Sequence, residues 1–337
     1  MFVVASHRTL TYPPFNTSRT NFEQRSHWSG RAGMSSEEFA ALSRACEACG
    51  LDPTGAELIH HSSNAVYVLR RHTAVGRVST NEADPDRPTR TYAVTQWLTT
   101  RHNFGATAPL PGVEPVRVNG YTVGFWQYYP QLPDIPGPTS KELGRLLRSL
   151  HDLPTPDIEL QRWTPLESLH EALLEDRTTG AISDEERSWL LRCIDEIRKE
   201  LSELDWPLGV GLIHGDAWAG NLLWDNRTNP VRPILGDWDW VSIGPREVDL
   251  IPTWHAAVRY GRDDTWVRNF IEEYGYDLSQ WSGYRLLLDM RDLVQITGPL
   301  RRATASVEHA DRLRQRIDDI RAGNRTTSWS HYVPHGY

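Results

Sequence analysis

Apolar residues recur with two different periods in the two parts of this chain. From Glu57 to Val78 they form short runs between polar turns, which predicts strands over Glu57–His60, Ala65–Leu69 and Ala74–Val78. Two further strands, Val116–Val118 and Tyr121–Tyr129, flank Asn119-Gly120, a dipeptide typical of two-residue hairpin turns. The first part of the chain is therefore expected to form a small antiparallel sheet, accompanied by helices over residues 35–49 and 87–100.

Beyond Pro133 the apolar residues follow a helical period. Thr139 and Glu142 have the spacing of a capping box, and they precede a stripe of leucines three and four positions apart. Further helices are predicted to start at Thr164 and to cover Ser183–Leu204, Val248–Tyr260, Asp264–Tyr274, Ser279–Ile296 and Ser306–Arg321. This part of the chain is expected to be mainly helical.

The 337 residues exceed the usual size of a single core, so two lobes are expected. Residues 1–33 are polar and aperiodic, and we interpret them as a disordered extension, with Met34 as an alternative start. The extended, proline-containing segment Tyr128–Pro133 marks the lobe boundary. The predicted organisation is an extension over 1–33, an N-terminal lobe over 34–129 and a C-terminal lobe over 130–337.

Composition excludes several classes of protein. The net charge of −8 argues against a nucleic-acid partner, and no run of eighteen apolar residues predicts a membrane span. Three cysteines, two of them a Cys46-x-x-Cys49 pair inside a helical pattern, give no disulfide framework and indicate a reducing, cytoplasmic compartment. The acidic charge is compatible with a cationic substrate, and equally with mere solubility.

The chemistry of the chain is concentrated between Gly211 and Asp239. His214-Gly215-Asp216 follows a short apolar run, and Asn221 lies five residues after Asp216. Two apolar runs, Leu222–Trp224 and Val231–Leu235, flank a turn-rich segment and predict a hairpin. Because the first strand starts beside the end of the second, Asn221 and Asp237 should lie at the same end of this hairpin, near Asp216. Asp, Asn and a second Asp are the groups that magnesium-dependent phosphoryl transfer requires.

This segment resembles the aminoglycoside phosphotransferase and choline kinase-like family, whose signature is His-Gly-Asp, an Asn five residues later, and an Asp after a short hairpin. The resemblance implies an α+β, two-lobed protein kinase-like fold with a small antiparallel-sheet N-lobe and a larger, mainly helical C-lobe. It also implies ATP and Mg²⁺, with Asp216, His214 and Asn221 as the catalytic residues: Asp216 orients the acceptor hydroxyl, and Asn221 binds metal together with Asp237. We expect His214 to contribute as a hydrogen bonder beneath the loop rather than as a proton carrier. Asp239 would share the metal or face the substrate. Asp249-Leu250 matches an Asp-Leu pair that supports the family's active site.

The nucleotide contacts of the N-lobe depart from the family pattern. The third strand should carry a phosphate-binding Lys, but Arg77 stands there, and the chain has only two lysines, Lys141 and Lys199. An Arg can bind phosphate through two N–H groups, so we expect Arg77 to take this role. The turn expected over the phosphates has no glycine and offers Ser62, Ser63 and Asn64. Tyr128, at the lobe boundary, is expected beside the adenine, and no Glu begins the following helix to pair with Arg77.

The family resemblance implies an acceptor site in the C-lobe, for which Trp218, Trp240 and Glu247 are candidates. The predicted activity is ATP-dependent phosphorylation of a hydroxyl on a small molecule: an aminoglycoside, another antibiotic, an amino alcohol or a sugar. The alternative is a catalytically weak pseudokinase with a regulatory role, suggested by Arg77 and the missing Glu. A metallohydrolase would need more His ligands than this segment supplies.

Overall fold

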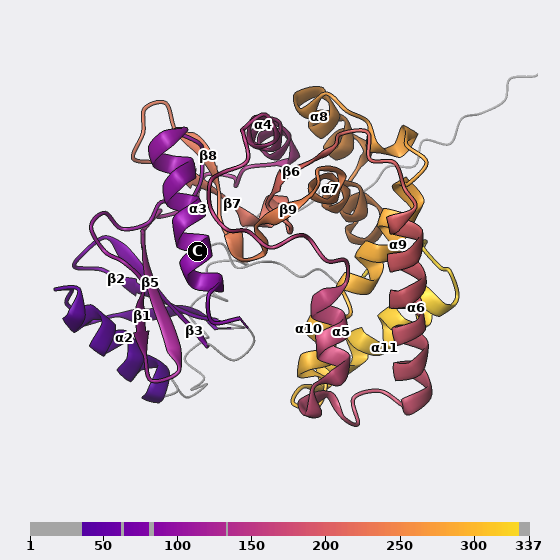
Figure 1. Cartoon of the computed structure of the whole chain (residues 1–337), viewed down its shortest axis with the longest axis horizontal. Helices are drawn as coiled ribbons and strands as arrows, with labels where there is room; N and C mark the ends of the chain where they lie inside the picture. Colours follow the sequence, from indigo (N-terminus) through magenta and orange to yellow (C-terminus); the bar gives the residue numbers. More distant parts are fainter. Residues whose placement is uncertain (1–35, 62–63, 81–83, 133, 330–337) are drawn as a thin grey trace, which may run out of the picture.

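The computed structural model describes residues 36–61, 64–80, 84–132 and 134–329. The predicted extension over residues 1–33, together with Ser35, Ser62 and Ser63, lies outside this range. Buried side chains form a smaller core around the sheet and a larger core among the helices. Figure 1 shows the sheet on one side and most of the helices on the other. The α+β class and the division into a small sheet and a helical part are confirmed.

Five antiparallel strands form the sheet, in the order β1-β2-β3-β5-β4. They are β1 (Glu57–His61), β2 (Asn64–Leu69), β3 (Ala74–Thr80), β4 (Val116–Val118) and β5 (Tyr121–Gln127). β5 ends two residues earlier than predicted, because its partner β3 begins at Ala74, which pairs with Gln127. The strands and the hairpin at Asn119-Gly120 are otherwise confirmed.

Two helices adjoin the sheet and belong to different cores. α2 (Ser36–Ala48) packs Leu42 into the smaller core, so close to the sheet that a Cβ on Gly76 would lie 2.6 Å from its Cδ1. α3 (Arg87–Arg101), predicted at almost the same residues, instead contributes Val94 and Leu98 to the larger core. α3 therefore fixes the sheet against the helical part of the molecule.

The helical part begins with α4 (Ser140–His151) and α6 (Asp184–Ser202), whose predicted starts are confirmed by capping boxes at Thr139 and Ser183. The other helices are α5 (Glu167–Leu174), α7 (Glu247–Tyr260), α8 (Asp264–Tyr274), α9 (Tyr284–Val294), α10 (Thr297–Arg302) and α11 (Val307–Arg321). α5 starts later than predicted, because Leu166 has a left-handed backbone with φ of 58°.

The predicted helix over Ser279–Ile296 is wrong in its first part. Asp277 Oδ1 accepts the N–H of Ser279 at 3.0 Å, and a separate 3₁₀ turn covers Leu278–Gln280. Such local side-chain bonds compete with helix formation, so the regular helix α9 begins only at Tyr284.

Two short ribbons bring the loop segments together. β7 (Leu222–Asp225) and β8 (Arg232–Leu235) form the predicted hairpin, with Leu222 opposite Leu235. β6 (Val210–Ile213) pairs with β9 (Ser242–Pro245). β9 was not predicted from the sequence, because Gly and Pro are uncommon inside strands. All three cysteines are free, and no helix in the described part of the chain is long and apolar enough to cross a membrane.

Candidate active site

The loop after β6 is held from below by a buried carboxylate. Asp249, on α7, accepts the backbone N–H groups of His214 at 2.7 Å and of Gly215 at 2.8 Å. His151 Nε2 lies 3.1 Å from the same carboxylate, and the other ring nitrogen lies 2.8 Å from the hydroxyl of Tyr274. The predicted supporting role of Asp249 is visible here as a chain of buried hydrogen bonds.

The His-Gly-Asp sequence fits this loop at each position. Gly215 has φ of 84°, and a Cβ there would lie 2.3 Å from the backbone oxygen of Trp240, so only glycine fits without displacement. His214 is fully buried, with Nε2 2.9 Å from the carbonyl of Gly236, and Nδ1 accepts the N–H of Asp216 at 3.3 Å. His214 therefore holds the loop in place through its buried hydrogen bonds.

The β7–β8 hairpin places Asn221 and Asp237 at one end, as predicted. Gly236 N–H donates to the carbonyl of Asn221 at 2.8 Å and ties the two strand ends together. Asn221 Nδ2 donates to the carbonyl of Asp216 at 3.1 Å, which leaves Oδ1 as a free acceptor. Asp237 has a left-handed backbone with φ of 59°, a conformation that functional sites tolerate more often than ordinary turns.

Three carboxylates and two guanidinium groups form the charged centre of the site. Arg77, on β3, forms an ion pair with Asp239 and lies 3.6 Å from Asp237. Arg291, on α9, lies 2.7 Å from Asp216. The Asp237 side chain is 36 % exposed. Even so, desolvation by the surrounding protein, followed by the nearby charge of Asp239, raises its pKa to about 6.

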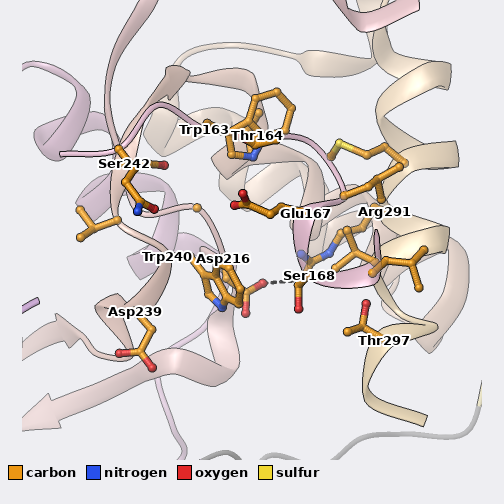
Figure 2. Close-up of a pocket in the computed structure, with 18 of the residues that line it drawn as sticks. Trp163, Thr164, Glu167, Ser168, Asp216, Asp239, Trp240, Ser242, Arg291 and Thr297 are labelled. Carbon is orange, nitrogen blue, oxygen red and sulfur yellow. Dashed lines mark hydrogen bonds and ion pairs between the residues drawn. The ribbon is translucent and has the colours of Figure 1, made fainter. Parts of the chain in front are cut away.

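A cavity of about 270 Å³ opens beside Asp216 and Asp239. We call it the large cavity. Figure 2 shows Trp163, Glu167 and Trp240 around it, with Arg291 and Thr297 on the helical side. The sequence did not predict Glu167, Trp163 and Arg291 as site residues. They lie far from the His-Gly-Asp motif in sequence, and a helical or loop pattern does not show that packing brings them to it. Arg87, Arg90 and Arg162 also line this cavity.

A second pocket, of about 80 Å³, lies between the sheet and the β7–β8 hairpin. We call it the small pocket. Its lining is mainly apolar and aromatic, with Val66, Trp126, Tyr128 and Leu223 among its residues, and it also includes Arg77 and Asp237. The small pocket and the large cavity are therefore adjacent to the same charged centre, since Arg77 in one pairs with Asp239 in the other.

A sequence model of the phosphotransferase enzyme family matches residues 55–287, which is more than half of the chain. The chain belongs to this family. The predicted enzyme class, a small-molecule phosphotransferase with an alcohol acceptor, agrees with this membership. No curated protein matches this phosphotransferase in sequence.

Solved structures confirm the predicted kinase-like fold. An aminopropanol kinase associated with a microcompartment has a TM-score of 0.65 at 18 % identity, covering 83 % of this phosphotransferase and 95 % of that chain. Amicoumacin kinase hAmiN has a TM-score of 0.64 at 16 % identity, with coverage of 87 % and 96 %. Aminoglycoside phosphotransferase APH(3'')-Id from Streptomyces rimosus has a TM-score of 0.55 at 18 % identity, with coverage of 75 % and 97 %.

The three predicted substrate contacts of the phosphotransferase have different outcomes. Trp240 lines the large cavity, where Arg87 stacks over its ring at 4.6 Å. Trp218 lines neither pocket, and its ring instead covers Gly220, where a Cβ would lie 2.2 Å from the indole. Glu247 is fully buried and accepts the N–H of Leu208 at 2.7 Å, so the expected substrate contact is not made. The prediction for Glu247 rested on its closeness to the motif in sequence. Its carboxylate instead accepts a backbone N–H from the loop before β6.

Those predicted nucleotide and metal residues that the structure describes also lie around the charged centre, whereas Ser62 and Ser63 are outside the described range. Asn64 Nδ2 lies 3.4 Å from Asp239, and Tyr128 lines the small pocket. Among the described residues, no group of three or more His, Cys, Asp or Glu has the geometry of a metal site. The donors present, two carboxylates and the free Oδ1 of Asn221, fit Mg²⁺, which keeps waters and phosphate oxygens in its shell and needs few protein ligands.

Proposed function

We propose that this protein transfers the γ-phosphoryl group of ATP to a hydroxyl group of a small molecule. The observation that carries the proposal is the meeting of two pockets at one charged centre. The large cavity is lined by Asp216 and Asp239, whereas the small pocket is lined by Asp237 and Arg77. Acceptor and donor would then approach each other at the three carboxylates, as phosphoryl transfer requires.

The small pocket is the proposed site of the nucleotide. Its apolar lining suits the adenine ring, with Tyr128 beside it, while Arg77 would bind the phosphates and Asn64, near Asp239, would add a polar group. Amicoumacin kinase hAmiN, a neighbour in fold, was solved with AMP-PNP. This supports a nucleoside triphosphate as the phosphoryl donor.

The proposed ligands of Mg²⁺ are Asn221, Asp237 and Asp239. When bound, the metal supplies positive charge against the phosphate oxygens in the transition state. Arg77 now contacts both carboxylates, so nucleotide and metal would draw its guanidinium away from Asp239 toward the phosphates. The chain thus holds a cation at this centre before and after the substrates bind.

Asp216 is the proposed base. The acceptor oxygen attacks the γ-phosphorus while the bond to the oxygen bridging the β- and γ-phosphates breaks, and ADP leaves. The proton of the acceptor hydroxyl passes to the Asp216 carboxylate late in the reaction. Because the transition state is loose, alignment of the hydroxyl contributes more than the strength of the base. The hydrogen bonds around His214 and Asp249 supply that alignment.

The large cavity is the proposed acceptor site. A volume of about 270 Å³ lies just below the usual range for drug-sized ligands and suits a molecule of one or two rings or a short chain. Trp163 and Trp240 offer apolar faces, and the carboxylate of Glu167 can receive an amino group. We therefore propose a small hydroxylated acceptor, with an amine as an acceptable substituent.

Magnesium-dependent release of ADP against a panel of amino alcohols, sugars and aminoglycosides tests the proposal. Acceptor-dependent release that falls at least 100-fold in Asp216→Asn, with ATP affinity retained, is the expected result. Measurable ATP binding without turnover for any acceptor would favour the alternative, a pseudokinase. That alternative draws on one observation, the occupation of the metal carboxylates by Arg77.

A further inference from the structure

Arg291 contacts the carboxylate of Asp216, although 75 positions separate the two residues. Its Nη2 donates to Asp216 Oδ1 at 2.7 Å, and the two side chains are 11 % and 29 % exposed. Figure 2 draws this contact at the edge of the large cavity. Within the described part of the chain, no hydrogen bond or ion pair engages Asp216 Oδ2, so the bond to Arg291 fixes one oxygen of the carboxylate and leaves the other for a ligand.

The two arginines of the charged centre pair with different carboxylates. Arg77 neighbours Asp237 and Asp239, whereas Asp216 has its ion pair with Arg291. The negative charge of Asp216 acts on Asp237 and is among the causes that raise the pKa of that residue. Without Arg291, Asp216 would face two like charges and lose the cation that now pairs with it, so its carboxylate would tend to rotate toward water.

Among the residues that the structure describes, the guanidinium of Arg291 contacts one carboxylate and joins no wider network of ion pairs. Its Nε is buried without a hydrogen-bond partner, and its ion pair is made with Asp216. The contrast is Arg259, which binds both oxygens of buried Asp292 as well as the carbonyl of Asn324. Arg291 thus has the contacts of a residue that orients one side chain, because among the described residues its guanidinium group pairs with Asp216 alone.

We propose that Arg291 is a positioning residue, which holds the Asp216 carboxylate so that Oδ2 faces the acceptor hydroxyl. The proposal rests on the proposed function, since Asp216 acts there as the base. Loose phosphoryl transfer depends on alignment, and a displacement of about 1 Å costs roughly 100-fold in rate. Loss of Arg291 therefore lowers kcat while leaving the KM for ATP nearly unchanged, because the nucleotide site does not include it.

Three variants test this role. Arg291→Met keeps much of the side-chain volume without the charge, and kcat should fall about 100-fold. Arg291→Lys should retain at least ten times the kcat of the Met variant, and guanidinium ion added to Arg291→Ala should restore part of its rate. Arg285→Met is the matched control on the same helix, since Arg285 is exposed and pairs with Asp289 at 3.8 Å. An Arg291→Met enzyme with the control's kcat would overturn the proposal.

Crystal structures of the wild type and of Arg291→Met separate failure of this inference from failure of the proposed function. The Asp216 carboxylate should leave its position in the variant, whether or not an acceptor is known. An unmoved carboxylate overturns the inference even if the protein is an active kinase. If the wild type transfers no phosphoryl group but the carboxylate moves, the proposed function fails and the positioning contact stands.

Discussion

Asp249 accepts the backbone N–H of His214 at 2.7 Å across 35 positions of sequence. The contact joins α7 to the loop that carries Asp216, and it is fully buried. A buried carboxylate that is bonded to two N–H groups and to His151 has little freedom. The position of the proposed base therefore depends on α7, whose Asp249 does not line the large cavity although its neighbours Val248 and Ile251 do.

Asp249→Asn should destabilise the protein and slow transfer. The amide nitrogen must face a backbone N–H group, so one buried donor loses its partner and the free energy of unfolding should fall by about 3 kcal/mol. Urea denaturation measures this change. Asp195→Asn, at an exposed site on α6, is the control and should change stability by less than about 0.5 kcal/mol. Equal stability of the two variants would contradict the supporting role of Asp249.

The convergence of Asp216, Asn221 and Asp237 could be predicted from the sequence because short-range rules determine it. A hairpin with a turn-rich middle brings its two ends together whatever the rest of the fold does. The starts of α4 and α6 were predictable for the same reason, since a capping box is complete within four residues. These features need no knowledge of tertiary packing.

The large cavity could not be predicted in this way. Arg291 and Glu167 lie on helices whose periodicity describes only which face is buried, and their approach to Asp216 depends on how α5 and α9 pack. Glu247 and Trp218 lie near the motif in sequence, yet Glu247 is fully buried and Trp218, whose indole covers Gly220, does not line the cavity. Proximity along the chain is therefore a weaker guide than the register of a hairpin.

Gly215→Ala should impair both folding and activity, because the added Cβ would meet the backbone oxygen of Trp240 at 2.3 Å. Gly112→Ala is a matched control, since Gly112 also has a positive φ of 75° but no atom within 4 Å of the added Cβ. Backbone strain alone should cost about 1–2 kcal/mol in both variants. Thermal denaturation should show a further loss in Gly215→Ala, and equal losses would mean that the Trp240 contact can relax.

Arg77→Met should raise the KM for ATP about 10- to 100-fold, which corresponds to the loss of a charged hydrogen bond. The KM of Arg77→Lys should lie between those of Arg77→Met and the wild type, because Lys keeps the charge but not the planar donor pair. Initial rates at saturating acceptor measure the effect. Arg117→Met is the control. Arg117 lies on the same sheet as Arg77, and its loss removes an exposed ion pair with Asp86 that should leave the KM unchanged. An unchanged KM in Arg77→Met would reduce Arg77 to a structural partner of Asp239.

His255 should make stability depend on pH. Burial lowers its pKa to about 4, against a smaller opposing effect of the hydrogen bond to Asp292 at 3.0 Å. Between pH 4 and 6.5 the unfolded chain then binds a proton that the folded protein does not, so stability rises with pH and is complete above pH 6.5. The fall toward pH 4 should reach about 3 kcal/mol. Urea titrations should show this slope flattened in His255→Gln, and an equal slope would assign the dependence to other groups.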